Sequence, residues 1–287
     1  MQVCSEADDQ GFFALLPETD VIWHNLRPID SYVLEAAPKL KLIQKIGVGV
    51  NTIDLDAARA RGIAVCNLPG SNSRAVAEHA LGLMLAVLRR IVTFDVLTRE
   101  GRGWDRPDHI EDTLGELAGR RVGMVGYGSV PRLLAPILTA MGAEVVYSNR
   151  SEPPDALGRR LPLDDLLAMS DIVSLHLPLV PATEHLMNAE RIAQMRRGSI
   201  LINTSRGGLI DTGALVSALR GHLGGAGLDV FESEPLPRAH PLTGLDNVVL
   251  APHVAWLTQE TMTRSVAAAA DNCRRLACGE PLAHRIV

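Results

Sequence analysis

The sequence predicts an α/β protein with a doubly wound parallel sheet, and three observations lead to this fold class. The first is residues 121–150, where the hydrophobic pattern changes from strand to helix and back to strand. The second is the alternation of strand and helix patterns after residue 150, which favours parallel strands joined by helices. The third is the length, because 287 residues with 47% hydrophobic content suit two domains better than one.

The N-terminal part has short apolar runs separated by turn residues. Three strands are expected here, at residues 21–23, 40–46 and 63–66. Before the third, Asp54 can cap a short helix that Gly62 ends. Ser73 can cap a long helix that we expect to run to about Leu97. Residues 98–119, which contain Gly101 and Pro107 among charged residues, then predict an irregular crossing between the two domains.

Residues 121–150 predict a nucleotide-binding unit. Gly126 allows a sharp turn after the first strand, and Gly128 lets the backbone approach a pyrophosphate at the N-terminus of the helix that follows. Gly142 ends that helix. Pro131 replaces the third glycine of the usual GxGxxG pattern; it is tolerated in a first turn but removes one N–H donor. A glycine-rich turn in an ordinary sheet is the alternative, but the strand–helix–strand context favours a dinucleotide.

The remaining chain continues the alternation. We expect strands at residues 172–177, 199–203, 225–230 and 248–250, and helices at residues 163–169, 188–195 and 212–220. The strands end in polar or glycine residues, and the carboxyl ends of parallel strands meet at one cleft. A last alanine-rich helix, at about residues 258–278, is expected to return to the first domain.

Composition excludes several classes of function. The net charge is −5 and no block of Lys or Arg is long enough for a nucleic-acid or membrane surface, so we expect a small-molecule partner. The four cysteines form no CxxC pair and no metal-ligand spacing, which favours a reduced, cytoplasmic compartment and no metal. The longest apolar run, at residues 80–88, is too short to span a bilayer, and the N-terminus has no signal core.

Seven segments carry a resemblance to a known family: GVGVNTIDLDAARARGIAV from Gly47, AVAEHALGLMLAVLR from Ala75, VGYGSV from Val125, LHLPLVPATEHLMN from Leu175, NTSRGGLID from Asn203, GLDVFESEPL from Gly227 and APHVAW from Ala251. In this order and spacing they resemble the D-isomer-specific 2-hydroxyacid dehydrogenases, the family that includes phosphoglycerate dehydrogenase and the glyoxylate and hydroxypyruvate reductases. The resemblance covers nearly the whole chain.

The resemblance implies a Rossmann NAD(P)-binding domain at residues 91–256 and a flavodoxin-like substrate domain at residues 1–90 and 257–287. The cleft between them would close on the substrate and exclude water. The family normally has another strand and helix before the N-terminal segment found here, so the substrate domain is expected to be shortened, with an uncovered sheet edge. The resemblance also implies a homodimer built through the dinucleotide domains. A nucleotide-sensing, corepressor-like binding protein on the same fold is the alternative.

Carried over to this chain, the resemblance implies three catalytic residues, Arg206, Glu234 and His253. The substrate-binding residues it implies are Val48, Gly49, Arg206 and Trp256. The cofactor-binding residues it implies are Gly126, Gly128, Ser129, Val130, Asn149, Arg150, Pro178, Thr183, Thr204, Ser205, Asp229 and His253. Glu232 lies close enough to compete with Glu234, and spacing alone leaves that choice open.

These residue types suit the reduction of a 2-keto acid. The planar guanidinium of Arg206 can pair with a carboxylate through two parallel hydrogen bonds, and His253 titrates near neutral pH. A Glu234 carboxylate beside His253 would favour the imidazolium form, which is ready to donate a proton. The alternatives without a catalytic role are that Arg206 is a solvated surface residue and that His253 only caps a helix.

The end of the second strand of the nucleotide-binding unit predicts the cofactor. NAD enzymes carry an acidic side chain there that binds the adenine ribose and would repel a 2′-phosphate. This chain instead has Asn149 and Arg150 within residues 147–151, so we expect NADP(H) to be preferred, with NAD(H) possible. If Arg150 points into solvent, either cofactor is usable.

Overall fold

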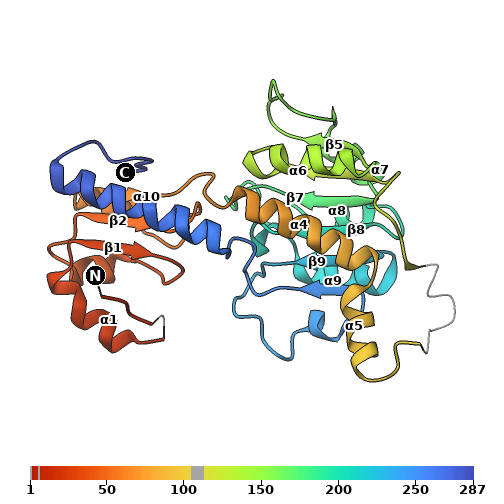
Figure 1. Cartoon of the computed structure of the whole chain (residues 1–287), viewed down its shortest axis with the longest axis horizontal. Helices are drawn as coiled ribbons and strands as arrows, with labels where there is room; N and C mark the ends of the chain where they lie inside the picture. The colour runs from red at the N-terminus through yellow and green to blue at the C-terminus, as the bar shows by residue number, and fades with distance from the viewer. Residues whose placement is uncertain (1, 6, 105–112) are drawn as a thin grey trace. The chain divides into compact units, whose positions relative to one another are not determined.

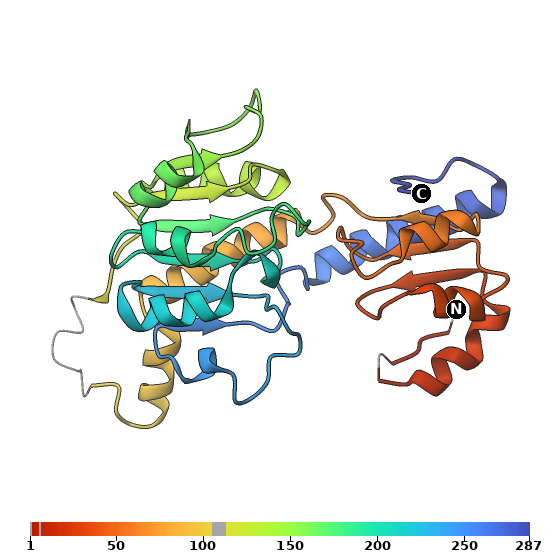
Figure 2. The ribbon, with the colours of Figure 1, turned by 180° about the vertical axis from the view of Figure 1, so that it is seen from behind.

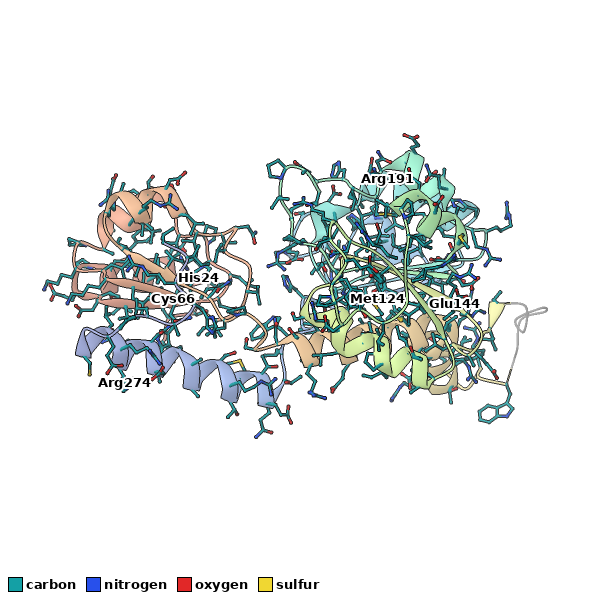
Figure 3. All side chains as sticks on the ribbon, turned by 90° about the horizontal axis from the view of Figure 1, so that it is seen from above. His24, Cys66, Met124, Glu144, Arg191 and Arg274 are labelled. Atoms are coloured by element: carbon teal, nitrogen blue, oxygen red, sulfur yellow. The ribbon has the colours of Figure 1, made fainter. Side chains whose placement is uncertain are left out.

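The computed structural model describes residues 2–5, 7–104 and 113–287, which form two compact units (Figures 1 and 2). Unit 1 is Met1–Asn72 with Leu257–Val287, and unit 2 is Ser73–Trp256. The boundary therefore lies at Asn72, and the expected boundary at residue 90 is wrong. The reason is that helix α4 (Ser73–Leu88) buries its apolar face in the core of unit 2. Figure 3 shows Cys66 within unit 1 and Met124 within unit 2, and both side chains are fully buried.

Unit 1 contains a three-stranded parallel sheet in the order β1-β2-β3. Its strands are β1 (Val21–His24), β2 (Leu42–Lys45) and β3 (Ala64–Cys66), and its helices are α1 (Asp9–Leu15), η1 (Leu16–Glu18), α2 (Ser31–Ala36), α3 (Leu55–Ala60) and α10 (Gln259–Cys278). One face of the sheet packs against the α1 to α3 region, and the other packs against α10 and the C-terminal segment. The side chain of Asp54 accepts a hydrogen bond from Ala57 N–H, so the predicted cap of α3 is confirmed.

The two edges of this sheet differ. At β3, Ile286 N–H donates to Val65 O, so the C-terminal segment lies along that edge. No strand among the described residues pairs with the outer edge of β1. Helix α10 is tied to the central strand by Asn272, whose Nδ2 lies 2.6 Å from Gln44 Oε1. No helix in the described ranges combines the length and the apolar character needed to cross a membrane.

Unit 2 contains a seven-stranded parallel sheet in the order β10-β9-β8-β7-β4-β5-β6. The strands are β4 (Arg121–Val125), β5 (Glu144–Ser148), β6 (Arg159–Arg160), β7 (Ile172–Leu175), β8 (Ile200–Asn203), β9 (Gly225–Leu228) and β10 (Val248–Leu250). The helices are α4, α5 (Ile91–Arg99), α6 (Ser129–Ala140), α7 (Leu163–Met169), α8 (Ala189–Gln194), η3 (Gly207–Leu209), α9 (Thr212–Gly221) and η4 (Pro241–Gly244). The doubly wound fold class is thus confirmed. The order in which strands are added to the sheet reverses between β4 and β7, and ligands of such sheets bind beyond the carboxyl ends of strands at this switch point.

Three expectations about the start of unit 2 are wrong. The long helix expected to reach Leu97 is two helices, because Arg90 between α4 and α5 adopts a left-handed conformation with φ 48°. Residues 98–119 are not a crossing between domains, since both sides of this segment belong to unit 2, although residues 105–112 lie outside the described residues. Ser73 lies inside α4 instead of capping it, and its hydroxyl pairs with the hydroxyl of Ser129 at 2.8 Å.

Candidate active site

The turn after β4 is built for close backbone approach. Gly126 has φ 92°, and a Cβ there would lie 2.4 Å from the carbonyl oxygen of His176, so only glycine fits. A Cβ at Gly128 would meet nothing within 4 Å, which leaves open space directly before α6. Pro131 is buried as the third residue of α6, and the helix forms in spite of it. Open space before a helix N-terminus suits a pyrophosphate, and the cofactor contacts of Gly126, Gly128, Ser129 and Val130 stay predictions.

The turn after β5 is held by side chains from two directions. Asn149 Oδ1 accepts a hydrogen bond from Tyr127 N–H at 3.3 Å, which ties this turn to the glycine turn. From β6, Arg160 Nη2 donates to the carbonyl oxygens of Asn149 and Arg150, at 2.9 and 2.8 Å. The side chain of Arg150 itself is exposed. Sequence reasoning missed Arg160, because a two-residue charged strand has no apolar pattern.

The ends of β7 and β8 carry the next predicted cofactor residues. Thr183 is buried, and its hydroxyl donates to Pro178 O at 2.7 Å, so it fixes the shape of the loop between them. Ser205 Oγ donates to Leu175 O at 2.8 Å, which joins β8 to β7. The hydroxyl of Thr204 is buried with no hydrogen-bond partner among the described residues. Such an atom is free to bind a ligand.

Arg206 follows β8 and lies largely buried in a tightly held loop. Its Nη1 donates to Ser205 O at 2.7 Å, and its carbonyl oxygen accepts from Asn203 Nδ2 at 2.9 Å. A Cβ at Gly207 would lie 1.8 Å from the carbonyl carbon of Phe231, so the loop presses directly on the segment after β9. Burial lowers the pKa of Arg206, while the negative charge of Glu234 raises it. A guanidinium remains charged at neutral pH in such surroundings, as an anchor for a carboxylate requires.

His253 and Glu234 form a close pair. His253 Nδ1 lies 2.6 Å from Glu234 Oε2, and Glu234 Oε1 accepts from Phe231 N–H at 2.9 Å. Burial raises the pKa of Glu234, but hydrogen bonds from His253 and Phe231, with the charges of His253 and Arg206, outweigh it and leave the pKa below its usual range. An ionised Glu234 accepts a hydrogen bond from Nδ1–H, so Nε2 is the ring nitrogen left for proton transfer.

The structure resolves the choice between the two glutamates. Glu232 Oε1 lies 2.6 Å from Nε2 of a different histidine, His185, and this second pair is more exposed. Glu234 is therefore the partner of His253. Sequence reasoning gave no signal for the pair of His185 and Glu232, because its members are 47 residues apart.

Asp229 and Trp256 both contact the turn that carries His253. The Asp229 carboxylate is fully buried and accepts hydrogen bonds from Val254 N–H and Ala255 N–H at 2.8 and 2.9 Å. Trp256 Nε1 donates to His253 O at 3.1 Å. Their roles toward cofactor and substrate remain predictions.

Val48 and Gly49 belong to unit 1, in the loop after β2. The carbonyl oxygen of Val48 accepts a hydrogen bond from Asn67 Nδ2 at 2.8 Å, and Gly47 O accepts from Leu68 N–H at 2.8 Å. These bonds hold the loop between β2 and α3 in a defined shape. The predicted substrate contact through Val48 and Gly49 N–H stays a prediction.

Comparison with known proteins relates this arrangement to one family. Residues 81–255 match the family described as "D-isomer specific 2-hydroxyacid dehydrogenase, NAD binding domain". A glyoxylate reductase of Thermofilum pendens is 45% identical over 260 residues, which are 88% of this chain and 76% of that protein. A D-3-phosphoglycerate dehydrogenase of Mycobacterium bovis is 41% identical over 279 residues, 95% of this chain, which spans only about half (52%) of that longer protein. A solved protein of Thermus thermophilus superposes with a TM-score of 0.91 at 39% identity, covering 100% of this chain and 91% of its own.

Proposed function

The chain belongs to the D-isomer-specific 2-hydroxyacid dehydrogenases, and on that premise we propose that it reduces small 2-keto acids of the glyoxylate and hydroxypyruvate type. It is an oxidoreductase that transfers a hydride between a nicotinamide cofactor and a 2-hydroxy or 2-keto acid. The observation that supports the roles of the residues most strongly is the 2.6 Å pair of His253 and Glu234, from the segments after β10 and β9.

In the proposed mechanism, Arg206 binds the substrate carboxylate with its guanidinium fork and polarises the neighbouring carbonyl. His253 donates a proton from Nε2 to the carbonyl oxygen as negative charge develops there. Glu234 holds the ring through Nδ1 and stabilises its charged form. The glycine turn after β4 and the ends of β5, β7 and β8 would hold a reduced nicotinamide cofactor, which would supply the hydride chemistry. Oxidation of the hydroxy acid uses the same residues in reverse, with His253 as the base.

The proposal includes a preference for NADPH over NADH. Arg150 brings a positive charge to the end of β5, and the turn has no carboxylate that would repel a 2′-phosphate. The hydrogen bonds from Arg160 to Asn149 O and Arg150 O support this, because they hold the turn in one shape before a ligand arrives.

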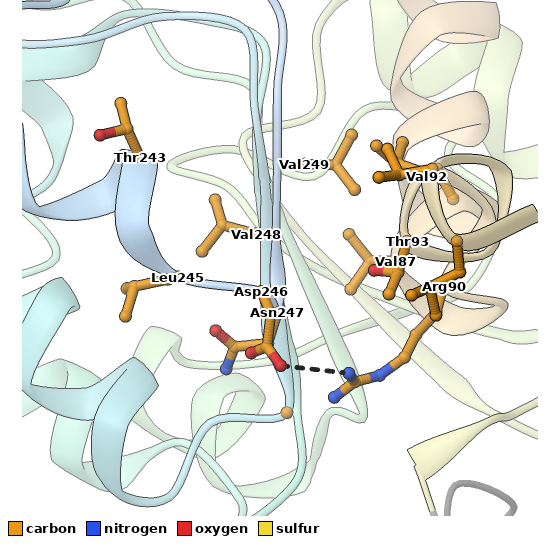
Figure 4. Close-up of a pocket in the computed structure, with 14 residues that line it drawn as sticks. Val87, Arg90, Val92, Thr93, Thr243, Leu245, Asp246, Asn247, Val248 and Val249 are labelled. Carbon is orange, nitrogen blue, oxygen red and sulfur yellow. Dashed lines mark ion pairs between the residues drawn. The ribbon is translucent and has the colours of Figure 1, made fainter. Parts of the chain in front are cut away.

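The proposal also includes a homodimer formed through unit 2, with α5 as the arm. Ile91, Val92 and Val96 of α5 are each about half exposed, which is unusual for apolar side chains on a short helix. Beside them lies a hollow of about 440 Å³ lined by α4, α5 and residues 243–249 (Figure 4). Arg90 and Asp246, which both line the hollow, form an ion pair at 3.7 Å. Its apolar lining suits apolar side chains presented by a second copy of the chain.

We also place the enzyme in the cytoplasm. The supporting observation is that all four cysteines are free thiols, as a reducing compartment keeps them.

Steady-state kinetics tests the function directly. Glyoxylate, hydroxypyruvate and larger 2-keto acids are each assayed with NADPH and with NADH, using the purified full chain. We expect turnover on at least one small keto acid. Tight cofactor binding without turnover on any of them would instead favour the corepressor-like sensor.

A further inference from the structure

Helix α4 packs unusually close to β9, and glycines make this possible. A Cβ at Gly225 would lie 2.7 Å from Val87 Cγ1, and a Cβ at Gly227 would lie 2.9 Å from Leu83 Cβ. Alternate residues of a strand share one face, and every fourth residue of a helix shares one side. On the strand side the series is 225, 227 and 229, and on the helix side it is 87, 83 and 79. The third pair is therefore His79 and Asp229, which directly follows β9.

This third position brings a histidine and a carboxylate together. His79 Nε2 is buried and has no hydrogen-bond partner within the described part of the chain. It lies 3.6 Å from Oδ1 of the fully buried Asp229 carboxylate. Closing that gap by about 0.7 Å would give an ordinary charge-assisted hydrogen bond. Each such donor stabilises a buried carboxylate, because burial without hydrogen-bond partners is unfavourable.

A hydrogen-bond donor to Asp229 matters because Asp229 holds the turn that carries His253. His253 has φ 56°, a left-handed conformation that costs free energy for a residue with a side chain. Three backbone N–H groups of this turn are bound to Asp229: His253 N–H donates to its carbonyl oxygen, and the N–H groups of Val254 and Ala255 donate to its carboxylate. Asp229 therefore fixes the direction in which the imidazole leaves the chain.

We propose that His79 is a positioning residue for the proposed reaction: its Nε2–H holds the Asp229 carboxylate, and Asp229 in turn holds His253 in its left-handed turn. The inference rests on the proposed function for its kinetic consequence, but its structural consequence stands apart from any turnover. Among the described residues, no hydrogen bond or ion pair joins His79 to His253, Glu234 or Arg206, so we assign its effect to Asp229.

The test compares His79→Leu, which removes the donor, with His79→Gln, whose amide nitrogen reaches a similar place. We expect His79→Leu to lower kcat about tenfold while KM for the keto acid changes less than twofold, and His79→Gln to restore most of kcat. Amide hydrogen exchange at Val254 and Ala255, measured without substrate, should speed up about tenfold in His79→Leu and return in His79→Gln. His79→Ala gives the same comparison if the leucine variant does not fold.

His222→Leu is the matched control, because His222 is another half-buried histidine, bound to Ile192 O at 3.1 Å near the amino end of β8. It should leave kcat and exchange at residues 254–255 unchanged. Wild-type kcat and exchange in His79→Leu would overturn the inference, and so would a loss that His79→Gln does not repair, since that marks a packing defect. A wild type without turnover would instead contradict the proposed function, and the exchange measurement would still decide the role of His79.

Discussion

His253 Nδ1 and Glu234 Oε2 lie 2.6 Å apart, which decides the chemistry available to each ring nitrogen. Because Nδ1 is occupied by the carboxylate, the proposed mechanism assigns proton transfer to Nε2. This division of labour requires an ionised Glu234, and the lowered pKa of that carboxyl provides it at neutral pH. In the proposed reduction, this geometry leaves Nε2 as the atom that delivers the proton.

Replacing His253 with Asn should separate catalysis from cofactor binding. Asparagine can keep a hydrogen bond to Glu234 and, among non-glycine residues, tolerates a left-handed backbone, but it supplies no proton at neutral pH. We expect kcat to fall by roughly 10²–10⁴-fold with cofactor affinity within twofold of wild type, from steady-state kinetics and fluorescence titration. His240→Asn is the control, since His240 caps η4 and asparagine caps equally well. A kcat within about twofold of wild type would remove His253 from the reaction.

Glu234→Gln should change how stability depends on pH. In the native state the pKa of Glu234 lies below its ordinary value of 4.5. The folded protein therefore binds the proton of this carboxyl group more weakly than the unfolded chain does. The resulting stability is complete above about pH 4.5 and is lost as pH falls through the lowered native pKa. The gap in Tm between wild type and Glu234→Gln should thus be largest near pH 7 and close toward pH 3. A Tm difference that stays constant or widens in acid would contradict this prediction. The control is Glu190→Gln, at an exposed residue of α8, whose Tm difference from wild type should not change with pH.

For single residues, the sequence predicts which side chains are candidates for the site better than it predicts which partner each side chain meets. Arg206, Glu234 and His253 are predictable because each follows a strand end within a family segment. Glu232 and Glu234 have the same charge and nearly the same position, and only the backbone path sends one to His185 and the other to His253. The contacts of His79 with Asp229 and of Arg160 with Asn149 and Arg150 join different elements of the fold. No local sequence pattern predicts them.

Among the elements, the unit of β4, α6 and β5 is the most predictable part of the fold. Its apolar spacing and its glycines at positions 126 and 142 set its limits within a residue or two. The break at Arg90 is not predictable in the same way, because the apolar pattern of α4 continues through Arg89 and Arg90 into α5 without a Gly or Pro. A left-handed arginine is rare, so no sequence rule favours it there.

Arg150, at the turn that ends β5, should decide the choice of cofactor. We expect wild type to favour NADPH over NADH with one shared keto acid, because a guanidinium can donate charge-assisted hydrogen bonds to a 2′-phosphate. Arg150→Ala should lower kcat/KM for NADPH about 10–100-fold and change it little for NADH. Arg220→Ala, at an exposed arginine near the end of α9, is the matched control. A wild type that favours NADH, or an alanine variant that loses nothing with NADPH, would place the 2′-phosphate elsewhere.

For the whole molecule, the division at Asn72 assigns α4 and α5 together to the unit with the glycine turn. The apolar surface of α5 therefore belongs to unit 2, where the resemblance to the family placed the contact between subunits. Burial of that surface in the monomer is incomplete, since Ile91, Val92 and Val96 remain about half exposed. A stable interface needs an apolar core of this kind inside a larger polar rim.

Sedimentation equilibrium at micromolar concentration should therefore find a homodimer, and a charge on α5 should weaken it. In a symmetric dimer the same surface occurs on both copies, so Val96→Asp introduces two carboxylates into one apolar contact. Burying each without a partner is unfavourable, and we expect the dimer Kd to rise at least about tenfold. Val266→Asp is the matched control, because Val266 is a similarly exposed valine on α10 of unit 1. Wild-type monomers at these concentrations, or equal weakening by both variants, would show that α5 does not carry the dimer contact.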